Sequence, residues 1–128
     1  MTTLTIHASG AASAAAAWER YADPALWSGW APQITRVEAS ADRIAAGVTG
    51  RVIGAFGVPV TFTVREVEEA ARRWSWTVQV GPVRLRLQHG VRERPEGCTT
   101  WLTIIGPLPV VLGYAPFARF ALGRLVAR

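Results

Sequence analysis

Residues 73–94 read RWSWTVQVGPVRLRLQHGVRER, and this stretch decides the fold. Apolar side chains occupy every second position over Trp74–Val80 and, with one exception, over Val83–Val91. The exception is His89, which stands in register with the apolar residues. Strict alternation of this kind is typical of strands with one buried and one wet face. Because Gly81-Pro82 predicts a tight connection, the stretch predicts an antiparallel hairpin.

The same alternation continues on both sides of this hairpin. A first strand is indicated at the start of the chain, where Leu4, Ile6 and Ala8 alternate with polar residues. Short connections separate six further predicted strands, which are Ile34–Ala39, Val48–Phe56, Val58–Val67, Arg73–Val80, Val83–Arg94 and Thr99–Ile105. Connections this short join antiparallel neighbours, so the sequence predicts a meander.

Two short helices should lie between the first and second strands. The first runs from about Ala11 to Tyr21, with Ser9 or Ser13 as its cap. The second begins at Asp23, a cap residue followed by proline in the first helical position.

The C-terminal stretch, Leu108–Arg128, is apolar, and we expect a helix that packs on the buried face of the sheet. Its helical spacing becomes clear from Phe117 onward, and Pro116 should either start the helix or kink it. The spacing puts four apolar residues on one side, namely Phe117, Phe120, Ala121 and Leu125. Together these elements predict an α+β fold in a single domain over residues 1–128.

Composition excludes several classes of protein. The net charge of +5 comes from arginine alone, and the arginines are spread along the chain, so nucleic-acid binding is not expected. Cys98 is the only cysteine, and the first residues lack a secretory pattern, so we expect a cytoplasmic protein without disulfides. Residues 98–118 carry no charge but contain three prolines and two glycines, so membrane insertion is not expected.

Three segments resemble the START-like (SRPBCC) superfamily of helix-grip proteins, in particular its polyketide cyclase and dehydrase branch and the Bet v 1-like proteins. They are residues 17–32 (AWERYADPALWSGWAP), 87–91 (LQHGV) and 98–108 (CTTWLTIIGPL). The resemblance implies a curved antiparallel sheet of about seven strands wrapped around the C-terminal helix, with a cavity between them. It implies either the binding of a small hydrophobic molecule, such as a lipid, a quinone or a polyketide, or a cyclase activity.

We expect aromatic and aliphatic residues to line this cavity, with His89 as the main polar contact. A polar group on a buried face needs a partner, and a histidine there can bond a ligand oxygen or move a proton. It can equally bond a backbone carbonyl or Thr103. The expected lining is Trp30, Phe62, Trp76, Val78, Leu87, His89, Trp101, Thr103, Phe117 and Phe120.

Three functions remain open at this point. The first is ligand binding, and the second is a cyclase in which His89 and Thr103 assist proton transfer. The third is a protein-interaction module, which a cavity below about 300 Å³ would favour. Under any of the three, we expect a monomer or a homodimer. No nucleophile, phosphate-binding or metal-ligand motif is present, so neither a cofactor nor a metal is expected.

Overall fold

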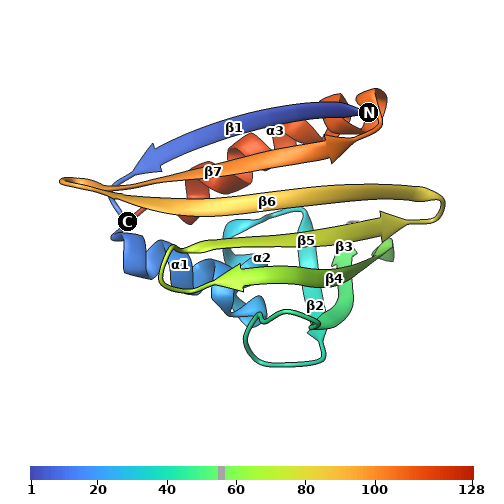
Figure 1. Cartoon of the computed structure of the whole chain (residues 1–128), viewed down its shortest axis with the longest axis horizontal. Helices are drawn as coiled ribbons and strands as arrows, with labels where there is room; N and C mark the ends of the chain where they lie inside the picture. Colours follow the sequence, from blue (N-terminus) through green and yellow to red (C-terminus); the bar gives the residue numbers. More distant parts are fainter. Residues whose placement is uncertain (55–56) are drawn as a thin grey trace.

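The computed structural model describes residues 1–54 and 57–128, and in these residues seven strands form one antiparallel sheet. The strands lie in the order β1-β7-β6-β5-β4-β3-β2, so only β1 departs from a simple meander (Figure 1). Their bounds are β1 (Thr2–Gly10), β2 (Ile34–Ala39), β3 (Thr49–Gly54), β4 (Pro59–Glu68), β5 (Arg73–Val80), β6 (Val83–Arg94) and β7 (Gly97–Gly106). The predicted α+β meander is confirmed. The end of the strand expected over 48–56 falls on residues 55 and 56, outside the described residues.

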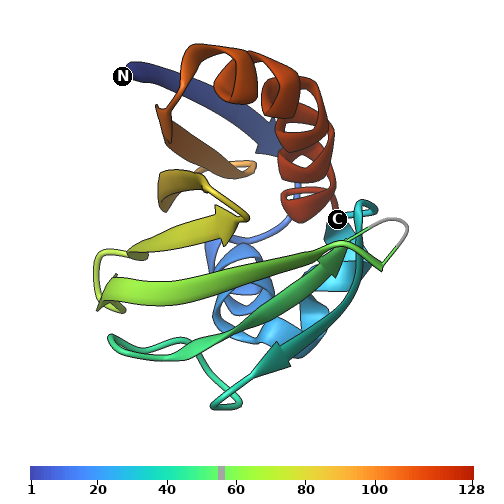
Figure 2. The ribbon, with the colours of Figure 1, turned by 90° about the vertical axis from the view of Figure 1, so that its right-hand side faces the viewer.

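Both predicted caps begin helices between β1 and β2. The Ser13 hydroxyl accepts a hydrogen bond from the Ala16 amide at 3.1 Å and starts α1 (Ala14–Ala22). The Asp23 carboxylate accepts from the Ala25 amide and starts the 3₁₀ turn η1 (Pro24–Leu26), which leads directly into α2 (Trp27–Trp30). These short helices lie at the concave side of the sheet (Figure 2).

The C-terminal helix, α3 (Leu108–Leu125), is longer than the spacing indicated and contains Pro116 in its interior. It starts directly after Pro107, so Pro116 does not start the helix. In the structure α3 runs beside β1 and β7 (Figures 1 and 2).

Of the four residues expected on the inner face of α3, two are buried and two are exposed. Ala121 and Leu125 are buried as expected, but Phe117 and Phe120 are each 60% exposed. The inner face instead carries Val111, Ala115, Ala118, Ala121, Leu122 and Leu125. Small alanines allow a helix to approach a sheet closely, whereas phenylalanines at those positions would hold it away.

The alternation in the central strands places their inner residues as predicted, except next to the hairpin turn, where Val80 is exposed and Val83 is half-buried. Trp74, Trp76 and Val78 on β5, and Leu85, Leu87, His89 and Val91 on β6, are all buried. The register pairs Trp74 with His89 and Trp76 with Leu87, so these side chains lie next to one another on the concave face.

Hydrogen bonds hold the C-terminal end of α3 against α1 and the segment that joins β1 to α1. The Ala12 amide donates to the Val126 carbonyl at 2.9 Å, and Arg20 Nη1 donates to the carbonyl of Ala127 at 2.6 Å. A β-carbon at Gly10 would overlap the Val126 carbonyl, so β1 and the end of α3 touch backbone to backbone here.

We therefore expect Gly10→Ala to destabilise the protein by about 2 kcal/mol, because a rigid backbone group must move. Gly123→Ala is the matched control: this glycine is exposed in α3 with open space around its α-carbon. It should stabilise the fold by about 0.5–1 kcal/mol through helix propensity. Urea unfolding of both variants measures the difference, and equal effects would contradict the proposed contact.

Candidate functional site

An aromatic cluster fills the centre of the concave face. Trp74 and Trp76 come from β5 and His89 from β6, and α2 adds Trp27 from above. The ring centroids of Trp27 lie 5.1 Å from Trp76 and 5.8 Å from Trp74. The Trp27 indole N–H donates to the Tyr21 carbonyl at 2.8 Å, which fixes this ring over the sheet.

A small cavity remains between this cluster, the segment after α2 and the inner face of α3. Its volume is about 30 Å³, which is about the share of one water molecule in the liquid. The residues around it are Trp27, Trp30, Ala31, Gln33, Ile34, Trp74, Trp76, His89, Leu102, Tyr114, Ala118, Ala121 and Leu122. The lining is thus apolar and aromatic, with a few polar groups.

His89 is the central polar group of this site. Its ring is buried and stacks on Trp74, with the two ring centroids 4.8 Å apart. Nε2 of His89 accepts a hydrogen bond from the indole N–H of Trp76, and the two nitrogens are 3.0 Å apart. Burial lowers the pKa of His89 from 6.5 to about 3, so the ring is neutral at physiological pH. Because an indole can only donate, Nε2 must be the unprotonated nitrogen, and the proton sits on Nδ1.

The Nδ1–H group of His89 has no hydrogen-bond partner, and two further buried polar atoms share this state in the described residues. They are the indole nitrogen of Trp74 and the amide oxygen Oε1 of Gln33. All three belong to residues that line the same cavity. Two donors and one acceptor without a partner thus belong to residues around this cavity.

Tyr114 brings a hydroxyl from α3 to the same cavity. Burial raises the pKa of Tyr114. A hydrogen bond with the Gln33 side chain lowers it by a smaller amount. Near neutral pH, Tyr114 is therefore protonated and His89 is neutral. The site offers hydrogen-bonding groups that do not ionise, rather than an acid and a base.

Three of the expected site residues, Trp30, Trp76 and His89, lie around the cavity. Three others lie on the same concave face without lining the cavity, and these are Phe62, Val78 and Leu87. Phe62 packs on Trp27 and Trp76 with centroids 5.5 Å apart.

Trp101 and Thr103 lie on the other face of the sheet. The register of β6 and β7 pairs His89 with Leu102, so Leu102 shares the concave face and its two neighbours point away. The Thr103 hydroxyl is bonded to Thr5 at 2.9 Å and cannot serve His89. The expected His89–Thr103 pair is therefore wrong.

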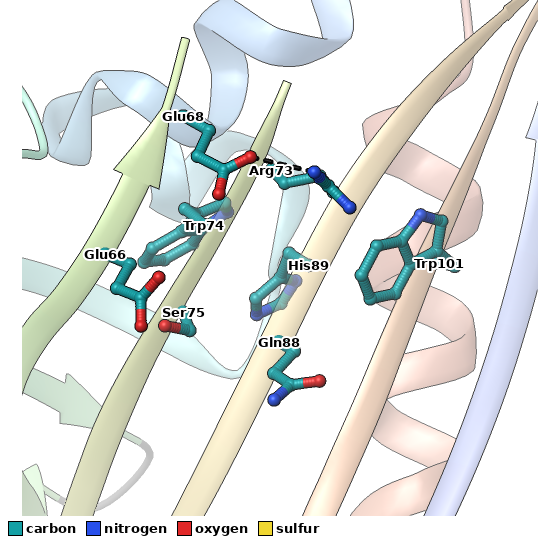
Figure 3. Close-up of a pocket in the computed structure, with 8 residues that line it drawn as sticks. All are labelled: Glu66, Glu68, Arg73, Trp74, Ser75, Gln88, His89 and Trp101. Atoms are coloured by element: carbon teal, nitrogen blue, oxygen red, sulfur yellow. Dashed lines mark hydrogen bonds and ion pairs between the residues drawn. The ribbon is translucent and has the colours of Figure 1, made fainter. Parts of the chain in front are cut away.

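The Trp101 indole covers the backbone of Gly90, where a β-carbon would overlap the ring. It borders a shallow groove of about 180 Å³, shown in Figure 3 with the ion pair between Glu68 and Arg73. Trp74 and His89 line this groove as well, but most of its other lining residues are charged or polar, so it differs from the expected apolar cavity.

Phe117 and Phe120 are also outside the cavity, because they lie on the exposed side of α3. The positions that α3 presents to the cavity are instead Tyr114, Ala118, Ala121 and Leu122. Sequence reasoning missed these residues, together with Trp27, Trp74 and Gln33. Trp74 could have been found, since it shares the register of Trp76 and His89, but no local pattern marks Gln33.

Two kinds of feature are absent from the part of the chain that the structure describes. No group of three or more His, Cys, Asp or Glu side chains in the described ranges is placed to hold a metal ion. Within the same ranges, none of the helices has both the length and the hydropathy needed to cross a bilayer.

Comparison with known proteins identifies the family and the fold. The sequence profile of the family described as polyketide cyclase / dehydrase and lipid transport matches residues 1–128. No curated protein sequence matches the chain significantly.

Solved structures share the fold at low sequence identity. Ara h 8.0201 superposes with a TM-score of 0.75 at 11% identity, covering 97% of this chain and 94% of that one. A Thermobifida fusca protein gives 0.76 at 24% identity, with 96% and 91% covered. The di-domain ARO/CYC BexL from the BE-7585A biosynthetic pathway gives 0.80 at 20% identity, covering 98% of this chain and 45% of that one.

The low pKa of His89 makes stability depend on pH in a defined window. Below pH 6.5 the unfolded chain gains a proton at this residue, and the folded state does not until about pH 3. The free energy of unfolding should therefore decrease as the pH is lowered, by about 1.6 kcal/mol between pH 6.5 and pH 5. In His89→Gln this slope should disappear, whereas His7→Gln, at an exposed position, should keep it. Urea unfolding at several pH values tests this, and an unchanged slope in His89→Gln would refute the assignment.

Proposed function

The chain belongs to the polyketide cyclase / dehydrase and lipid transport family, and from this premise we propose that it binds a small hydrophobic molecule carrying an oxygen acceptor. The molecule lies between the concave face of the sheet and α3. The Nδ1–H group of His89 donates a hydrogen bond to its oxygen. Lipids, quinones and polyketides that carry a carbonyl group fit this description.

The observation that carries the proposal is the gathering of unpartnered polar atoms around one apolar cavity. A buried donor or acceptor without a partner costs about 1–3 kcal/mol. His89, Trp74 and Gln33 each have such an atom, and all three line the cavity. An apolar ligand with one or two oxygens would satisfy them while the tryptophans contact its carbon skeleton.

The cavity of about 30 Å³ is too small for such a ligand, so binding requires α3 to move away from the sheet. The construction of α3 allows a movement of this kind. Its C-terminal end is tied by Ala12 and Arg20, whereas its first turn has no side-chain cap. The part of α3 beside the cavity presents Ala118 and Ala121, which lose little contact area when the helix moves.

A cyclase is the second candidate, because a hydroxyl does lie near His89 in the form of Tyr114. A pocket can accelerate ring closure by positioning alone. However, the pKa of His89 is lowered to about 3 and that of Tyr114 is raised, so neither group exchanges protons readily near neutral pH. The site therefore supports binding better than acid–base catalysis.

A protein-interaction module is the third candidate, and the small cavity favours it by the criterion stated above. The unpartnered atoms favour ligand binding, because an interaction module has no need of buried polar groups around an internal cavity. Direct titration decides between the two.

We expect saturable quenching of tryptophan fluorescence when the protein is titrated with fatty acids, quinones and aromatic polyketides, because Trp27, Trp30, Trp74 and Trp76 all line the cavity. Ala118→Leu should abolish binding by filling the cavity, whereas Gly113→Ala, exposed on the same helix, should not change it. No saturable response from any class, in folded protein, would favour the interaction module.

The polar contact is tested separately with naphthoquinone and naphthalene, which differ in their oxygens. His89→Phe retains an aromatic ring and removes the Nδ1–H donor. It should weaken naphthoquinone binding about tenfold and leave naphthalene binding unchanged. Equal losses for both compounds would show that residue 89 acts through packing alone.

A further inference from the structure

The exposed face of α3 carries almost no polar groups. Eight of its ten exposed residues are apolar or glycine, and these are Leu108, Pro109, Leu112, Gly113, Pro116, Phe117, Phe120 and Gly123. Phe117 and Phe120 are each 60% exposed, and Leu112 is 57% exposed. A helix on a protein surface normally presents charged residues to solvent. An exposed apolar face of this extent indicates a surface that binds something.

The charged side chains of α3 and of the residues after it are all positive. Arg119 and Arg124 are its only charged residues, and Arg128 follows the helix. Glu96 is the last acidic residue of the chain, so α3 and the residues after it carry no carboxylate side chain. The preferred occupant must therefore combine hydrocarbon with negative charge.

A groove of about 470 Å³ at the C-terminal end of α3 adds to this basic character. Arg20, Arg124 and Arg128 line it, beside the exposed Leu26 and the partly exposed Trp30. Arg20 donates to the carbonyls of Leu125 and Ala127, and Arg124 donates to the carbonyl of Gly29. A guanidinium has five N–H donors, so these bonds leave capacity for an anion in the groove.

We propose that the outer face of α3 docks on the surface of an anionic lipid bilayer. Phe117, Phe120 and Leu112 enter the boundary between headgroups and acyl chains, and the helix lies in the plane of the interface. The arginines of the groove bind headgroup phosphates. The proposal does not depend on ligand binding, since it concerns the outer face of α3 rather than its inner face.

A second copy of this chain fits the face less well. Two copies packed through α3 would bring Arg119 and Arg124 of one near those of the other, with no carboxylate on α3 to pair with them. A bilayer supplies both hydrocarbon and phosphate to the same surface.

Sedimentation with vesicles tests the proposal. The protein should bind vesicles of phosphatidylcholine and phosphatidylglycerol in equal parts, bind phosphatidylcholine alone at least tenfold more weakly, and dissociate as salt is raised. Phe117→Ser combined with Phe120→Ser should weaken binding at least tenfold. The matched control is Val58→Ser combined with Val80→Ser, which removes two exposed apolar side chains elsewhere and should leave binding unchanged.

The role of charge is tested by Arg119→Gln combined with Arg124→Gln, which should also weaken binding at least tenfold. Arg86→Gln combined with Arg92→Gln, both exposed on β6, is the control. The proposal would be overturned if the unsubstituted protein did not bind the mixed vesicles. It would also be overturned if the variant with Phe117→Ser and Phe120→Ser bound them as tightly as the unsubstituted protein does. A dimer in the absence of lipid that the same variant converts to monomer would assign the face to self-association instead.

Different measurements test ligand binding in the cavity and docking of α3 on a bilayer. Without vesicles, the double phenylalanine variant should bind naphthoquinone as the unsubstituted protein does, because its substitutions lie outside the cavity. A loss of vesicle binding with unchanged naphthoquinone binding supports the docking surface, and the quinone titration alone decides the cavity.

Discussion

The packing of Trp27 against Trp74 and Trp76 is the contact on which the rest of the structure depends. It joins the short helices to the centre of the concave face, and the bond from the Trp27 indole to the Tyr21 carbonyl ties α2 to α1. The large rings fill the space that the curvature of the sheet creates, since protein interiors are close-packed. What remains is a cavity of about one water molecule, closed on its last side by the alanines of α3.

The same packing determines the chemistry of His89. A histidine in water titrates near neutral pH and can transfer protons. Enclosed by tryptophan rings and bonded at Nε2, His89 is held neutral with its proton on Nδ1. The aromatic cluster thus converts a titrating group into a fixed hydrogen-bond donor, which suits recognition of a carbonyl oxygen better than catalysis.

The strands and the position of His89 could be predicted because β5 and β6 have one wet and one buried face, so arginines and apolar residues alternate. The residues of β7 that face the concave side could not be predicted in this way. Trp101, Leu102, Ile104 and Ile105 are all apolar, and only the register with β6 shows that Trp101 and Thr103 point away from His89. The same difficulty applies to α3, which is apolar on all sides, so no periodicity separates Ala118 from Phe117. Gln33 enters the site through tertiary packing alone.

The pairing of β1 with β7 has a consequence for the order in which the molecule can assemble. Thr2 pairs with Gly106 and Gly10 with Cys98, so the first strand pairs with the last strand of the chain, β7. A ribosome adds about 5–20 residues per second, so β1 waits for several seconds or longer before its partner emerges. The sheet therefore cannot be completed from the N-terminus onward, and closing so long a loop is the slow kind of contact in folding. Until then β1 is an unpaired edge, open to wrong partners in the crowded cell.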